Sequence, residues 1–341
     1  MGFDPKDYEE PVFLVYYLRS LARAIGIDLE QLKEKLYRDD IDFVGEKLRR
    51  YWDKEGVSYN ESDLINCDTA FNTVCEWARY KKAYDFHPAF VDYLKDTEDA
   101  PIYGSVLNRL PFKDFYINLG RRKMDLESGV FPEWVRGMFV RLFPIKDGAY
   151  IGITVQCERP DGEWIFMSHR LVVGNGDTFQ QTMDRQKMVM QKDRTVEKVK
   201  KDWAVFYRIA VNACQYLCAS NAEIHDVKST KGNRPVVRID GKMRPVSVQI
   251  SEVGVRLGKK FEKMYRNAEN SQEFRGDSKG RSPCKPHVRR AHWHHYWTGP
   301  GRTVLELRWL EPVFVMGDSE KIDVVVHNVS GENAVTERKI G

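Results

Sequence analysis

The chain has 341 residues, of which 42% are hydrophobic and 12% aromatic. That is enough apolar material to fill a core, so the composition excludes an intrinsically disordered protein. The 54 Lys and Arg residues nearly balance the 50 Asp and Glu residues. Residues 256–308, however, contain 13 Lys or Arg and only 5 Asp or Glu. A basic segment on an otherwise slightly acidic chain indicates one localised contact with a polyanion.

The start of the chain and its most apolar stretch both argue against export and membrane insertion. The first residues, MGFDPKDYEEP, are acidic and rich in turn formers, unlike a secretory signal. Residues 203–220 are the most apolar long stretch, but Arg208, Asn212 and Gln215 within them are typical of a buried amphipathic helix. None of the six cysteines shows Cys-x-x-Cys spacing. We therefore expect free thiols, a cytoplasmic location and no membrane partner.

Residues 1–108 are predicted to form a mostly helical N-terminal region, because apolar residues recur there at helical spacing. The clearest helix follows Asn60 and Ser62, either of which can cap its start. Its apolar stripe consists of Leu64, Cys67, Phe71, Val74 and Ala78.

Residues 109–316 are predicted to form an α+β core. Strand-like runs separated by short turn signals indicate an antiparallel meander, and they cover 113–119, 137–145, 149–157 and 163–173. A helix over 196–219, an exposed loop over 227–244, a strand over 246–250 and a second helix over 257–268 follow. Residues 317–341 add a short strand at 322–326 and a polar tail. The predicted fold class is α+β: a helical N-terminal part followed by a mixed, mainly antiparallel sheet with packed helices.

Chemistry-bearing residues concentrate in a predicted hairpin at residues 286–310, PHVRRAHWHHYWTGPGRTVLELRWL, which holds four of the eight histidines. Gly299-Pro300-Gly301 supplies the turn between two strands. Strand alternation separates an apolar face from a polar one. The polar face is predicted to hold Arg290, His292, His294, Tyr296, Glu306 and Arg308.

The register of this hairpin is predicted by pairing its apolar faces, because a slip of one residue would bury Glu306 and Arg308. With Trp293 opposite Leu307, His294 lies beside Glu306 and His292 beside Arg308. We expect the apolar face to be buried as one group, comprising Trp293, Trp297, Leu305, Leu307 and Trp309.

Four interpretations of the polar face remain open. In the first, His292 and His294 ligate zinc, although Arg290 and Arg308 would repel a cation. In the second, His292, His294 and Glu306 are catalytic residues of metal-free RNA cleavage, since imidazole titrates near neutrality. In the third, the segment only binds RNA or the ribosome, with cations on phosphates and aromatic rings on bases. In the fourth, the hairpin only packs.

In the RNA-binding interpretation, RNA contacts more of the basic segment than the polar face of the hairpin. The turn of the hairpin and the basic side of the helix that begins near residue 257 are also expected to contact RNA. The RNA-binding candidates are His287, Arg289, Arg290, Tyr296, Arg302, Arg308, Lys259, Lys260 and Lys263.

The run KPHVRRAHWHHYW at 285–297, followed by Gly299, Gly301, Arg308-Trp309 and Phe314-Val315, resembles the C-terminal signature of a type V-A anti-CRISPR family. A looser fit covers 110–119, 203–224 and 252–258. The resemblance implies an inhibitor encoded by a phage or mobile element and acting in the cytoplasm of a bacterial host.

The resemblance also implies recognition of the N-terminal peptide of a nascent target, such as the type V-A CRISPR effector nuclease, on RNA or a translating ribosome, followed by loss of the message. It assigns no catalytic residue, and leaves open whether RNA cleavage is intrinsic or performed by host RNases. We expect no cofactor. The alternatives are a binding-only protein that sequesters a partner protein or ribosome, and a metal-dependent hydrolase.

Overall fold

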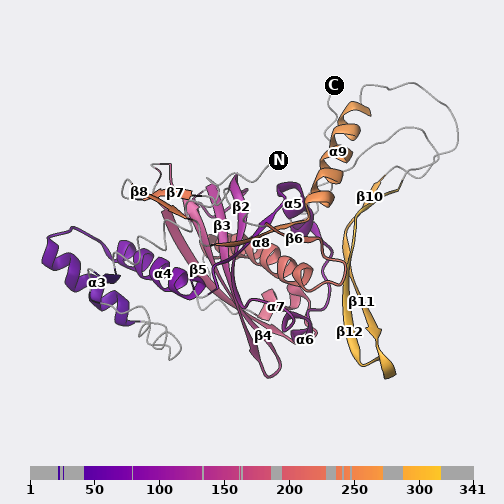
Figure 1. Ribbon diagram of the computed structural model, residues 1–341, viewed down its shortest axis with the longest axis horizontal. Helices are drawn as coiled ribbons and strands as arrows, with labels where there is room; N and C mark the ends of the chain where they lie inside the picture. The colour runs from indigo at the N-terminus through magenta and orange to yellow at the C-terminus, as the bar shows by residue number, and fades with distance from the viewer. Residues whose placement is uncertain are drawn as a thin grey trace.

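The computed structural model (Figure 1) describes residues 42–315, together with 22, 23 and 26. Within 42–315 it leaves out 79, 133, 161, 163, 186–193, 228–235, 240–241, 246–247 and 272–286. The predicted strand over 322–326 and the helical pattern before residue 42 therefore lie outside the described residues. The predicted boundaries at 108 and 316 stay predictions.

A seven-stranded mixed sheet forms the centre of the described chain, in the order β5-β4-β3-β2-β1-β9-β6. Strands β2 to β5 pair antiparallel with their sequence neighbours, which confirms the predicted meander. β1 instead pairs parallel with both β2 and β9, which makes the sheet mixed. The strands are β1 (Lys82–Phe86), β2 (Asp114–Lys123), β3 (Trp134–Ile145), β4 (Gly148–Glu158), β5 (Trp164–Gly174), β6 (Ile224–Asp226) and β9 (Gln249–Val253).

Helices cover both faces of the sheet. The larger core lies between one face and α8, whose Phe206, Tyr207 and Tyr216 are fully buried. The smaller core lies between the other face and α4, whose start is fixed by a reciprocal capping box between Asn60 and Asp63. The helices are α3 (Asp42–Glu55), α4 (Glu61–Trp77), α5 (Pro88–Asp96), α6 (Gly104–Leu107), α7 (Phe179–Arg185), α8 (Arg194–Leu217) and α9 (Val255–Ser271). The α+β class with helices in the N-terminal part is thus confirmed.

Three local predictions need correction. β1 lies within the stretch predicted to be mostly helical. It was not predicted because the hydrophobic pattern of a buried run of five residues does not distinguish a strand from a helix. The predicted loop over 227–244 contains two strands, β7 (Val236–Ile239) and β8 (Lys242–Pro245), which pair antiparallel. The strand predicted over 246–250 is β9 and lies three residues further on.

None of the helices within the described residues is long and apolar enough to cross a membrane. The longest of them, α8, keeps Asn212 and Gln215 on its buried surface, as the sequence predicts for a helix inside a protein core.

Candidate functional site

The predicted hairpin is present and runs along one side of the molecule, where Figure 1 draws it in yellow. Its strands are β11 (His292–Thr298) and β12 (Val304–Leu310), joined through a short 3₁₀ turn at Pro300–Arg302. Gly299 and Gly301 both adopt positive φ in this turn, and Arg302 does so as well. β10 (His287–Arg289) and β13 (Val313–Val315) pair antiparallel just beyond it.

The predicted faces of this hairpin are right but its predicted register is wrong. Trp293 pairs with Trp309 and not with Leu307, so every cross-strand pair is shifted by two residues. A shift of two residues keeps each side chain on its face, and the hydrophobic pattern therefore cannot distinguish the two registers. The consequence for the site is that His294 lies opposite Arg308, while Glu306 lies opposite Tyr296 and His292 opposite Leu310.

The inner face of the hairpin belongs to the larger core. The ring of Trp309 lies 5.2 Å from Phe90 and 5.8 Å from Tyr216, and its Nε1 donates to Thr97 Oγ1 at 3.2 Å. Trp293 Nε1 donates to Asn212 Oδ1 at 2.9 Å. Both indoles are therefore buried with their N–H groups satisfied, which fixes the position of the ribbon.

Trp297 departs from the predicted group of buried residues. It shares the parity of Trp293 but is 57% exposed. The ribbon extends past the body of the protein near its turn (Figure 1), and Trp297 lies close to that turn, where more than half of its surface is exposed.

Hydrogen bonds to its backbone fix the second strand, β12, to the segments that directly follow α8 and α6. Asn221 Nδ2 donates to Trp309 O at 2.8 Å, and Asn221 Oδ1 accepts from Trp309 N at 3.1 Å. Ser220 N donates to Leu307 O at 2.9 Å, and the Arg109 guanidinium donates to Leu305 O. The hairpin is thus held as a rigid element and not as a loop.

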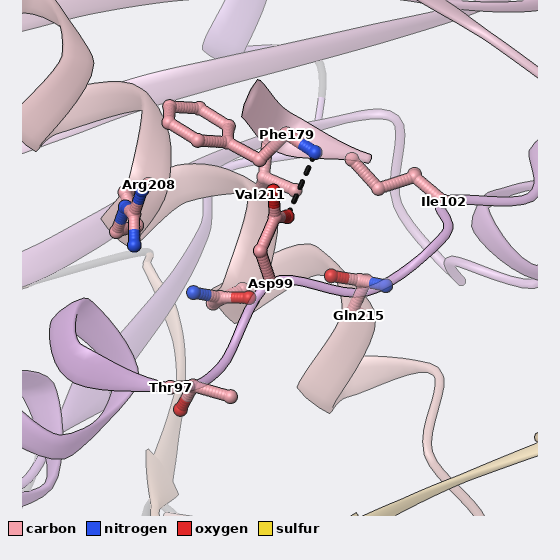
Figure 2. Close-up of a pocket in the computed structure, with 8 residues that line it drawn as sticks. Thr97, Asp99, Ile102, Phe179, Arg208, Val211 and Gln215 are labelled. Carbon is pink, nitrogen blue, oxygen red and sulfur yellow. Dashed lines mark hydrogen bonds between the residues drawn. The ribbon is translucent and has the colours of Figure 1, made fainter. Parts of the chain in front are cut away.

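A small pocket lies next to the inner face of the hairpin (Figure 2). Asp99 accepts hydrogen bonds from Phe179 N at 2.8 Å and Gln180 N at 2.9 Å, so it caps α7. The Arg208 guanidinium lies 4.9 Å from the Phe179 ring. The pocket adjoins the hairpin, because Thr97 and Asn212 in its lining accept hydrogen bonds from the indoles of Trp309 and Trp293. Its lining residues are Thr97, Asp99, Ile102, Phe179, Arg208, Val211, Asn212 and Gln215.

The outer face of the hairpin carries a stack of three side chains. The His294 and Tyr296 rings lie 4.1 Å apart at 30°, and the Arg308 guanidinium lies 5.5 Å from the Tyr296 ring. His294 is exposed, and Tyr296 is 38% exposed. An exposed imidazole, phenol and guanidinium in one stack offer both flat rings and a cation to a ligand.

Glu306 lies on this face, and one of its carboxylate oxygens accepts two hydrogen bonds. Its Oε1 accepts from Ser220 Oγ at 2.6 Å and from Arg308 Nε at 3.1 Å. These two hydrogen bonds lower the pKa of the Glu306 carboxyl, first through Ser220 and then through Arg308. Glu306 is therefore a carboxylate at neutral pH and orients Arg308, which argues against a role as general acid.

His295 lies on the same face of the hairpin as Trp293. Its ring lies 5.1 Å from the Tyr103 ring. The pKa of His295 is lowered mainly by burial and secondarily by the nearby His294. Its Nε2 is buried without a hydrogen-bond partner among the described residues. A neutral imidazole here supports packing of the ribbon.

The predicted basic residues divide into three groups. Arg290 and Arg302 are exposed on the hairpin, and Lys259 and Lys263 are exposed on α9. Lys260 forms an ion pair with Glu311, which connects α9 to the end of the hairpin. The side chains of His287 and Arg289 lie outside the described residues. No group of three or more His, Cys, Asp or Glu residues suited to a metal ion occurs in the described part of the chain.

Sequence reasoning missed the residues that hold the hairpin. Asn212, Ser220, Asn221 and Arg109 lie far from it in sequence, and none belongs to a recognisable motif. The one available signal was Asn212, a polar residue within an otherwise apolar helical stripe. Such a residue needs a buried partner.

These features define an α+β protein with a mixed sheet and a docked hairpin that exposes rings and cations. The chain belongs to the anti-CRISPR type V subtype A2 family, whose family model matches residues 84–317. Its fold is similar to that in the crystal structure of AcrVA2, with a TM-score of 0.53 and 13% identity over 92% of this chain and 100% of that one. No curated protein matches the chain. The family match begins within β1 and includes the whole hairpin.

Proposed function

We propose that this protein, whose family supports an anti-CRISPR-like function, acts while its target is being synthesised. It recognises the N-terminal peptide of the nascent type V-A CRISPR effector nuclease and causes translation-dependent loss of that message. The outer face of the hairpin contacts RNA at the translating ribosome, in the cytoplasm of the bacterial host.

The observation that carries the RNA contact is the stack of His294, Tyr296 and Arg308. Flat rings stack on unpaired bases, and each such contact is worth about 1–3 kcal/mol. The guanidinium that Glu306 orients lies on the same face, where it can contact a phosphate. A rigid ribbon presents these groups without a large ordering cost on binding.

The geometry favours contact over acid–base cleavage by the hairpin itself. Glu306 is held ionised by Ser220 and Arg308, so it cannot serve as the general acid, and any proton donation would fall to His292 or His294. We propose that host RNases destroy the message. Intrinsic cleavage by His292 and His294, which share a face with Arg308, is the second candidate.

The test uses a reconstituted translation reaction programmed with the effector message. Arg308→Gln and Tyr296→Ala should weaken RNA association and reduce message loss. Arg308→Gln should also make the plot of log binding constant against log salt concentration less steep, by about 0.7. Arg121→Gln is the matched control. Arg121 also lies over an aromatic ring, 3.9 Å from Trp134, and donates to a glutamate, Glu158, at 3.1 Å, but it belongs to β2 and not to the hairpin.

Equal message loss with the Arg308, Tyr296 and Arg121 variants would remove the hairpin from the proposal. Cleavage that persists without host RNases, and disappears in His292→Ala and His294→Ala while RNA binding remains, would establish the intrinsic nuclease instead.

A further inference from the structure

We propose that the free edge of β11 pairs antiparallel with the same edge of a second copy of this chain, so that two hairpins form one four-stranded sheet. The inference does not depend on the proposed function. The partner is a second copy because the edge, the rings beside it and the charges around it are complementary to themselves under two-fold symmetry.

The hydrogen bonds of the hairpin show which of its edges is free. Alternate residues of β12 bond through their backbone to the body of the protein, and these residues are Leu305, Leu307 and Trp309. In an antiparallel pair, residues that bond to the partner strand alternate with residues that bond away from it. The residues opposite on β11 are Trp297, His295 and Trp293, so their N–H and C=O groups face away from β12. No hydrogen bond to these groups is found within the described residues.

The free stretch of this edge has the length of one strand. Ala291 O accepts from Glu98 N at 2.8 Å, which closes the edge at its start, and Gly299 follows its last residue. His295 is the middle residue of β11 (His292–Thr298). A two-fold axis at His295 therefore pairs the whole strand with its copy, and it sets Gly299 of the second copy, which has no side chain, opposite Ala291.

The exposed ring of Trp297 is covered by this pairing. It is 57% exposed in the single chain, on a face where Trp293 and Trp309 are buried. In the pair, Trp297 of one copy lies opposite Trp293 of the other, and such neighbours have Cβ atoms about 5 Å apart. Because Trp293 lies opposite Trp309 within the hairpin, the inner face then carries one apolar row across four strands. Burial of this ring from both copies adds apolar stabilisation to the backbone hydrogen bonds.

The outer face of the paired hairpins brings no like charges together. His294 of one copy lies opposite Tyr296 of the other, and rings of this kind already stack at 4.1 Å within one chain. The row across the four strands runs from Arg308 through these two rings to Glu306 of the second copy, so cation and carboxylate lie at opposite ends. β11 also contains neither Lys nor Pro, residues that protect an edge strand from pairing.

The first test measures the mass of the full chain by sedimentation over a concentration series. The pairing is short, so we expect a weak dimer that dissociates on dilution and leaves Trp297 exposed in the monomer. Trp297→Asp should raise the dissociation constant of the dimer at least about tenfold, because it places a carboxylate in the apolar row. Val304→Asp is the matched control and should dimerise like the wild type. Val304 is 47% exposed near the same turn, but it lies on β12 and on the outer face.

A wild-type chain that remains monomeric up to about 1 mM overturns the inference. Equal dimerisation of the wild type and both variants would show that another surface forms the dimer, and it overturns the inference as well. A monomeric wild type whose RNA binding is weakened by Trp297→Asp would assign the ring to the RNA surface instead.

The second test determines the register by disulfide formation. His294→Cys and Tyr296→Cys chains are oxidised separately and as an equal mixture, with the wild type as the control for native cysteines. Opposite residues that exchange no hydrogen bonds have Cα atoms about 4.5 Å apart, which a disulfide can span. We expect an additional covalent dimer in the mixture and in neither variant alone. Its absence from the mixture, or its formation by Tyr296→Cys alone, overturns the pairing about His295.

Discussion

Three histidines are held in the neutral form by their surroundings. Burial lowers the pKa of His87, whose Nδ1 lies so close to α9 that a Cβ on Gly258 would come within 2.1 Å of it. Burial also lowers the pKa of His169, whose Nδ1 lies 2.9 Å from Tyr207 Oη, and that of His295 under the hairpin. Each imidazole packs as a neutral ring, and charging it would disturb the packing around it.

These shifts predict a loss of stability in mild acid. The unfolded chain binds a proton at each histidine near its ordinary pKa of about 6.5, whereas the folded chain resists protonation until lower pH. The free energy of unfolding should therefore fall as pH decreases through about 6.5 and continue to fall until the folded-state pKa is reached. His87→Gln and His169→Gln should each reduce this slope, by up to about 1.4 kcal/mol per pH unit. Urea unfolding over a series of pH values measures the slope, and identical profiles for wild type and variants would contradict the assignment.

The hairpin shows how much of an element can be inferred from sequence. Alternation predicted which of its side chains face the core, and Trp293, Leu305, Leu307 and Trp309 are all buried. The register depended on the length of the turn, and the pattern could not distinguish registers two residues apart. β1 was missed for a related reason, since a short buried run lacks a period. The anchoring residues could not be predicted, because Asn212 and Asn221 meet the ribbon only after the chain has folded.

Trp309 and Trp297 lie on the same face of the hairpin but differ in burial. Trp309 is 1% exposed and is surrounded by rings of the larger core, so Trp309→Ala should cost about 3–5 kcal/mol. Trp297 is 57% exposed, so Trp297→Ala should change stability by no more than about 0.5 kcal/mol. Chemical denaturation of both variants provides the comparison. Similar costs for the two substitutions would show that the turn end of the ribbon is packed against the protein.

At the scale of the whole molecule, two surfaces lie on different sides of one sheet. The hairpin and α9, linked by the Lys260–Glu311 ion pair, place cations and rings on one side, while β5 and α4 lie on the other (Figure 1). Under the proposed function the first surface contacts RNA at the translating ribosome.

The measurement that tests this account most directly is the half-life of the effector message in cells that express the protein. Two altered messages are compared with the natural one. In the first, synonymous codons change the RNA at the start of the gene but keep the peptide. In the second, paired compensating frameshifts keep nearly all of that RNA but change the peptide. We predict that the protein shortens the half-life of the natural and synonymous messages and spares the frameshifted one. Loss of the frameshifted message, with survival of the synonymous one, would show that RNA sequence and not the nascent peptide is recognised, and would contradict the account.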